Sequence, residues 1–102
     1  MLPLLEQNRG ELARLCNVYG VRRLVVFGSA ARGDFDPNSS DVDLYVEFSD
    51  THRLGYSDRF LDFALAVEHL LGRPVDLLTP RAVTNPHFRR ALMVDQLELY
   101  AA

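Results

Sequence analysis

The chain has 102 residues, of which 48% are apolar and 25% are charged, and its formal net charge is −3. These values are typical of one globular domain and exclude a disordered, collagen-like or coiled-coil chain. No apolar stretch approaches the ~20 residues of a membrane span, and the first residues lack the features of a secretory signal. We therefore expect one domain over residues 1–102, located in the cytoplasm. The acidic charge argues against direct binding to nucleic acid.

Helices and strands are predicted to alternate along the chain, because stretches of helical and of alternating apolar spacing follow one another between glycine and proline residues. In chain order we expect a helix over 3–19, a strand over 22–27, a tight turn over 28–33 that opens a short helix, a loop over 34–40, a strand over 41–48, a helix over 56–71, a strand over 75–78, a helix from Asn85-Pro86 to about 94, and an edge strand over 97–100. This order predicts an α/β fold, with helices packed on a small mixed β-sheet.

Asp41 and Asp43 are the first candidate site residues. They lie two positions apart on a predicted strand, so their carboxylates project from the same face, with Cα atoms roughly 6.6–7 Å apart. At that distance the two charges repel by about 2–2.5 kcal/mol at an effective dielectric of about 20, and a divalent cation removes this cost. Carboxylates suit Mg²⁺ or Mn²⁺, which also bind phosphate oxygens. Taken alone, the pair is also compatible with two solvated acids on an exposed strand.

Gly28 and Ser29 follow the buried strand and open a short helix. A glycine at such a turn lets the backbone approach a ligand closely, and the free N–H groups at a helix start favour phosphate. An ordinary strand-to-helix turn capped by serine is the alternative. A third acid, Asp76, lies between the apolar residues Val75 and Leu77, so we expect its carboxylate to be partly desolvated. Beside the first two acids it would complete a three-carboxylate cluster able to hold two cations.

Together these residues resemble a known family. The run Val-Phe-Gly-Ser-Ala-Ala-Arg-Gly-Asp at 26–34, followed by Ser-Asp-Val-Asp-Leu at 40–44, is similar to the minimal nucleotidyltransferases, the smallest members of the DNA polymerase beta-like nucleotidyltransferase superfamily. The helix from Tyr56 and the run Pro-Val-Asp-Leu-Leu at 74–78 fall where that family has its third helix and third acid. The resemblance covers about residues 12–100.

The resemblance implies a metal-dependent enzyme that transfers a nucleoside monophosphate, AMP from ATP in the first instance, to a hydroxyl acceptor. Asp41 and Asp43 would ligate two Mg²⁺ or Mn²⁺ ions. Asp76 would ligate one of them and help to deprotonate the acceptor. All three acids would thus be both metal ligands and catalytic residues.

The resemblance also implies a nucleotide-binding turn. Gly28 and Ser29 would hold the triphosphate, and Arg32 would lie near it. Two departures from the family pattern stand out. The spacer after Ser29 is one residue longer than is common, which leaves the path of residues 34–40 open. Ala30 stands where arginine is common, which removes one phosphate contact.

A partner protein is the last implication. The chain is too short to carry the extra domains with which larger relatives hold an acceptor, so we expect it to use the surface of another chain. In the family, that partner is a small helical toxin of the HEPN class, and the nucleotidyltransferase is the antitoxin that modifies a toxin tyrosine. A homo-oligomer remains open.

Two rival functions compete with this one. In the first, the chain is a binding module that neutralises its partner by contact, with transferase activity secondary or lost. In the second, the Asp-x-Asp pair belongs to a glycosyltransferase, a reading disfavoured because those enzymes use a larger fold with no role for an upstream Gly-Ser. Two further features, Arg22-Arg23 and Arg89-Arg90, are interpreted as solvated pairs, or else as a contact with nucleic acid or an acidic partner.

Overall fold

The computed structural model describes residues 3–33, 41–49, 56–81 and 84–102. Its elements, in chain order, are α1 (Pro3–Gln7), α2 (Arg9–Tyr19), β1 (Val21–Phe27), α3 (Ser29–Arg32), β2 (Val42–Phe48), α4 (Tyr56–Leu71), β3 (Val75–Leu78), α5 (Pro86–Asp95) and β4 (Leu97–Ala101). The predicted loop over 34–40 falls outside the described residues. No helix in the described part of the chain is long and apolar enough to cross a membrane.

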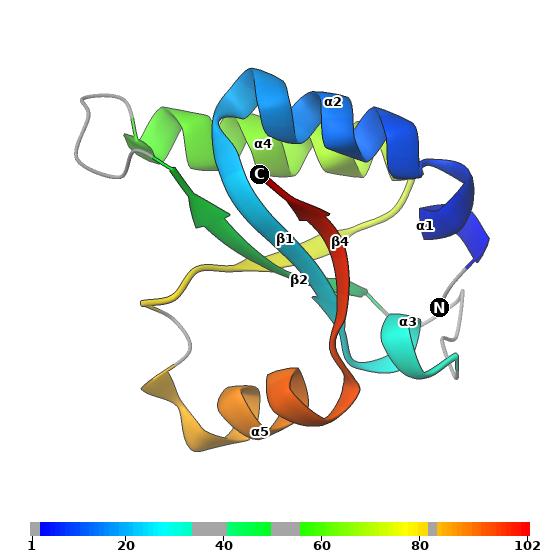
Figure 1. Ribbon diagram of the computed structural model, residues 1–102, viewed down its shortest axis with the longest axis vertical. Coiled ribbons are helices and arrows are strands. Elements are labelled where there is room, and N and C mark those ends of the chain that lie inside the picture. The colour runs from blue at the N-terminus through cyan, green and yellow to red at the C-terminus, as the bar shows by residue number, and fades with distance from the viewer. Residues whose placement is uncertain (1–2, 34–40, 50–55, 82–83) are drawn as a thin grey trace.

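The four strands form one sheet in the order β3-β2-β1-β4. Strand β1 is antiparallel to β2 and to β4, whereas β2 is parallel to β3, so the sheet is mixed, as predicted. A parallel pair needs a crossover connection, and α4 lies within that connection. Helices α2 and α4 pack together on one side of the sheet, and α5 lies on the other side (Figure 1).

The hydrophobic core lies between the sheet and the α2–α4 layer. Its central members are Leu12, Leu15 and Cys16 of α2, Leu24 and Val26 of β1, Val42, Leu44 and Val46 of β2, and Phe63 and Val67 of α4. Along β2 the residues alternate strictly between buried and half-buried. This confirms the alternation predicted for the strand, and it turns Asp43, Tyr45 and Glu47 to the face opposite the core.

One predicted helix is broken in the structure. The expected helix over 3–19 divides at Asn8, whose Nδ2 donates a 2.8 Å hydrogen bond to the carbonyl oxygen of Leu4. Asparagine side chains that bond to nearby backbone compete with helical geometry, so the division falls at Asn8 and not at Gly10. The expected end of this helix at residue 19 is confirmed, because Gly20 follows it in the left-handed conformation with φ of 70°.

Helix α5 begins as its sequence predicts. The side chain of Asn85 accepts a 2.9 Å hydrogen bond from the backbone N–H of His87. Pro86 occupies the first helical position, where its missing N–H costs nothing. The helix therefore has a defined start at Asn85 and Pro86.

Candidate active site

Strand β2 places Asp43 in the middle of the candidate site. Across the antiparallel pair Asp43 lies opposite Phe27 of β1, and across the parallel pair it lies opposite Asp76 of β3. Asp41 directly precedes β2, two residues before Asp43, and is exposed. The sheet thus brings Asp43 and Asp76, which are far apart in the sequence, into neighbouring positions at one end of adjacent strands.

The charges of these acids act on one another. The pKa of Asp43 is raised to about 6, first because the side chain is partly buried, and then because Asp76 and Asp41 are both negative. Arg32 opposes this rise, so its guanidinium also lies within electrostatic range of Asp43. The three predicted acids and the predicted arginine therefore share one neighbourhood.

Asp76 is more exposed than the sequence predicts. We expected a partly desolvated carboxylate between Val75 and Leu77, but Asp76 is exposed. Strand β3 is a four-residue strand at the edge of the sheet, and residues adjacent in a strand point to opposite faces. The apolar neighbours of Asp76 therefore contact the other side of the sheet and leave its carboxylate in water, and the carboxylate that burial affects is that of Asp43.

The three carboxylates do not form a ready cluster. Within the residues that the structure describes, no group of three or more His, Cys, Asp or Glu side chains is arranged to hold a metal ion. The three negative carboxylates repel one another, which opposes their close approach. Their oxygen-only chemistry, and the mutual repulsion that raises the pKa of Asp43, nevertheless fit a divalent cation of the Mg²⁺ type.

Gly28 forms the turn between β1 and α3 with a positive φ of 71°. A Cβ atom at this position would lie 2.6 Å from Oδ2 of Asp43, closer than real contacts allow. The backbone carbonyl of Gly28 accepts hydrogen bonds from the N–H groups of Ala31 and Arg32, at 3.1 and 3.0 Å. The sequence suggested a glycine that makes room for phosphate, and the structure adds a second reason, because the glycine also makes room for Asp43.

Helix α3 follows this turn and is anchored by its alanines. Ser29 begins the helix and is half-buried, whereas Ala30 is fully buried in the core. Position 30, where the family commonly has arginine, is therefore a core position in this chain. Arg32, at the end of the helix, is exposed and lies near Asp43.

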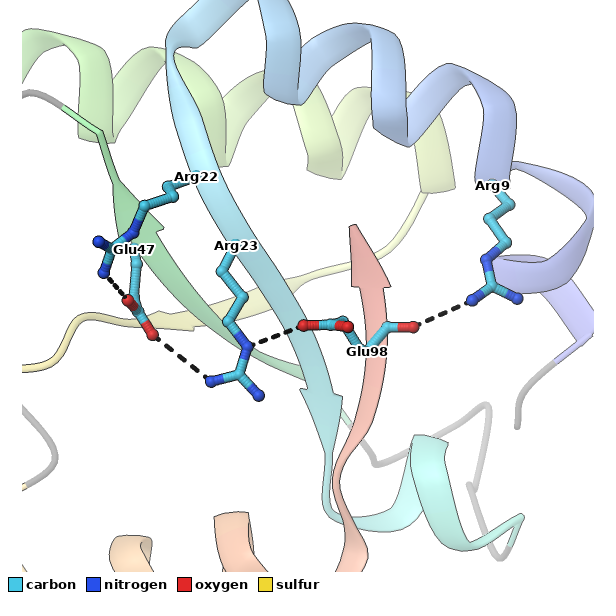
Figure 2. Close-up of polar contacts among 5 residues, drawn as sticks. All are labelled: Arg9, Arg22, Arg23, Glu47 and Glu98. Atoms are coloured by element: carbon cyan, nitrogen blue, oxygen red, sulfur yellow. Dashed lines mark hydrogen bonds and ion pairs between the residues drawn. The ribbon is translucent and has the colours of Figure 1, made fainter. Parts of the chain in front are cut away.

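A network of ion pairs continues the same sheet face beyond the acids (Figure 2). Glu47 of β2 is paired with Arg22 and with Arg23, the latter at 3.6 Å, and it accepts a hydrogen bond from Tyr45. Arg23 also binds Glu98 of β4 at 2.9 Å. Arg22 and Arg23 keep exposed side chains, as expected of a solvated pair, and they also form ion pairs that the sequence did not predict. The alternation of β2 in the sequence predicts that Asp43, Tyr45 and Glu47 share this face, and the structure confirms it.

Comparisons with known proteins agree with this geometry. The family model described as "Nucleotidyltransferase domain" matches residues 9–98. A curated protein of Methanocaldococcus jannaschii, named "Putative protein adenylyltransferase MJ1379", is 34% identical over 77 residues, which cover 76% of this chain and 75% of that protein. A second protein of that organism, "Putative protein adenylyltransferase MJ0128", is also 34% identical over 77 residues, covering 76% of this chain and 74% of its own length.

Solved structures share the fold. One described as a "putative minimal nucleotidyltransferase" superposes with a TM-score of 0.74 at 33% identity, covering 95% of both chains. A toxin–antitoxin structure with AMP-PNP gives a TM-score of 0.70 at 21% identity, covering 93% of this chain and 74% of the other. The chain therefore belongs to the nucleotidyltransferase domain family, and its fold is that of the minimal nucleotidyltransferases.

Proposed function

We propose that this chain is a metal-dependent adenylyltransferase that moves AMP from ATP to a tyrosine hydroxyl of a HEPN-class toxin and thereby acts as its antitoxin. The observation that carries the proposal is the pairing of Asp43 with Asp76 directly beside the Gly28 turn. The two curated relatives named as protein adenylyltransferases support the choice of AMP and of a protein acceptor.

In the proposed reaction the acceptor oxygen forms a bond to the α-phosphorus of ATP, the bond to the β-phosphate oxygen breaks, and pyrophosphate leaves. Asp41, Asp43 and Asp76 would hold Mg²⁺ or Mn²⁺, which would neutralise charge that develops on the phosphates. Asp76 would accept the hydroxyl proton, a role that its exposed position on the edge strand suits.

The triphosphate would lie over the turn. Gly28 shapes the turn with its positive φ, Ser29 offers a hydroxyl, and the exposed Arg32 offers a guanidinium within range of Asp43. Cationic and N–H donors of this kind stabilise negative charge on a transferring phosphoryl group. Nucleotide contacts are thus assigned to Gly28, Ser29 and Arg32.

The partner is proposed from the structural relatives. One of them is a chain of a structure described as a tri-AMPylated Shewanella oneidensis HEPN toxin in complex with MNT antitoxin, with a TM-score of 0.65 at 17% identity over 96% of this chain and 73% of that one. ATP is an intracellular substrate, which supports the expected cytoplasmic location. Contact with a helical partner would also supply the acceptor surface that a domain of this size needs.

The test separates catalysis from contact. The chain is mixed with a HEPN-class toxin, Mg²⁺ and ATP, and the mass of the toxin is followed for the addition of AMP. The same mixture with Asp41→Asn/Asp43→Asn should show no addition and should lose neutralisation of the toxin. Neutralisation that survives in the double variant would instead favour the binding-module alternative.

A further inference from the structure

We propose that Tyr45 determines substrate specificity, its ring forming an apolar platform beside Asp43 on which an aromatic ring of a substrate packs. The inference deepens the proposed function and rests on it. The aromatic ring belongs to the adenine of ATP or to the phenol of the acceptor, and the experiment below distinguishes these two sources.

The strand register places Tyr45 next to the chemistry. It follows Asp43 by two residues on β2, so it projects from the same face, one step of roughly 6.6–7 Å further along the strand. Its neighbours across the strands are Val25 of β1 and Leu78 of β3. Val25 is buried and Leu78 is half-buried, so an apolar row runs directly beside the row of Asp43 and Asp76.

The ring of Tyr45 is held from its far end. Its hydroxyl is hydrogen-bonded to Glu47, two residues further from Asp43 along β2. Glu47 is paired in turn with Arg22 and Arg23 (Figure 2). The polar end of Tyr45 is thus directed toward Glu47 and away from Asp43, and the ring is half-buried on the face that the two residues share.

The rest of the network fixes Glu47 to the sheet. Arg23 bridges Glu47 and Glu98, at 3.6 and 2.9 Å, and the carbonyl oxygen of Glu98 accepts a 3.0 Å hydrogen bond from Arg9 of α2 (Figure 2). Charges shared among several partners lose less side-chain freedom per contact than an isolated pair. An aromatic ring with a fixed hydroxyl and an adjacent apolar row is the chemistry on which planar aromatic groups pack.

The first measurement is binding. Dissociation constants of Mg²⁺–AMP-PNP and of Mg²⁺–tripolyphosphate are compared for the wild type and Tyr45→Leu, with circular dichroism confirming that the variant is folded. If the ring packs on adenine, Tyr45→Leu weakens AMP-PNP about tenfold and leaves tripolyphosphate unchanged. Tyr45→Phe keeps the ring and stays close to the wild type, and Glu47→Gln gives an intermediate loss because the ring is less fixed.

The second measurement is transfer of AMP to N-acetyl-tyrosinamide. If the ring packs on the acceptor, Tyr45→Leu leaves AMP-PNP binding unchanged and raises the KM of this probe about tenfold at nearly constant kcat. Unchanged AMP-PNP affinity together with an unchanged KM overturns the inference, as does an equal loss for AMP-PNP and tripolyphosphate. A wild type that binds neither AMP-PNP nor tripolyphosphate overturns the proposed function as well.

Discussion

Asp43 and Asp76 lie opposite each other on parallel strands, yet only Asp43 is shielded from water. Strand β2 lies inside the sheet and β3 lies at its edge. The electrostatic cost of bringing the acids together therefore falls on Asp43, whose pKa is raised to about 6 by burial and by the two neighbouring acids. We therefore expect substitutions of Asp43 and of Asp76 to differ in their effects on stability, AMP transfer and metal binding.

The free energy of unfolding should depend on pH through Asp43. Because its folded-state pKa lies near 6 and its ordinary value is 3.8, the folded protein holds this proton more tightly than the unfolded chain. The resulting stabilisation is complete below about pH 4 and is lost as the pH rises through 6. A shift of about two units is about 3 kcal/mol, which solvent around the exposed part of the side chain reduces to about 1–2 kcal/mol.

Asp43→Asn should consequently be more stable than the wild type at pH 7.5 and equal to it at pH 4, measured by urea unfolding without added metal. Asp62→Asn, which removes an exposed acid from α4, controls for the loss of one negative charge. A stability difference for Asp43→Asn that is constant from pH 4 to 7.5 would contradict the raised pKa.

Gly28→Ala should destabilise the protein more than Gly33→Ala does. Both glycines have positive φ, so both substitutions incur backbone strain of roughly 1 kcal/mol or more. Only at Gly28 would the new Cβ also meet Oδ2 of Asp43, since nothing lies within 4 Å of it at Gly33. Thermal unfolding measures the difference.

A double-mutant cycle then tests the Gly28–Asp43 contact. Adding Asp43→Ala should restore part of the stability lost in Gly28→Ala, with a coupling of about 1 kcal/mol or more. Strictly additive effects would mean that the turn and the carboxylate do not constrain each other.

Mg²⁺ or Mn²⁺ together with AMP-PNP should raise the Tm of the wild type. Saturation at about 100 times Kd adds about 2.7 kcal/mol, which raises the Tm of a domain of this size by roughly 10–20 °C. Asp43→Asn should lose most of the rise, because it lacks a carboxylate that we assign to the metal. Asp62→Asn should keep the rise, and an equal rise in all three proteins would refute the site.

Asp76→Asn should affect turnover more than nucleotide binding. Asp76 is exposed at the sheet edge, so its loss should change the free energy of unfolding by no more than about 0.5 kcal/mol. Loss of a general base costs ~10²–10⁴-fold in rate. Single-turnover AMP transfer, paired with an AMP-PNP titration, measures both quantities. Normal AMP transfer would mean that Asp76 is only an acid at the sheet edge with no part in the reaction. A loss of AMP-PNP binding as large as in Asp43→Asn would mean that the role of Asp76 is assigned wrongly.

The sequence predicted the parts of the fold that depend on local signals. Alternation identified β2 and its two faces, Gly20 ended α2, and Asn85 with Pro86 began α5. Each of these features depends on residues within a few positions of one another. The break at Asn8 was missed because asparagine within an apolar helical pattern gives a weaker signal than the glycine two residues later.

The environment of the candidate site was harder to predict. Val75 and Leu77 suggested a buried Asp76, but exposure depends on the position of β3 at the sheet edge, which neighbouring residues along one strand do not encode. The pairing of Glu47 with Arg22 and Arg23 depends likewise on the register between two strands. The sequence therefore predicts which motif residues lie near one another. Their burial and their partners depend on the order and the register of the strands, which the sequence does not show.

The alternation of β2 also governs how this chain can change in length during evolution. One residue inserted between Val42 and Phe48 would reverse the face of every residue after it, turning core residues such as Val46 to water and directing Glu47 into the apolar layer. A change in length ahead of Asp41 leaves that alternation intact. Insertions and deletions should therefore accumulate in the spacer after Ser29 while β2 keeps a constant length, which holds Asp43 on its face of the sheet.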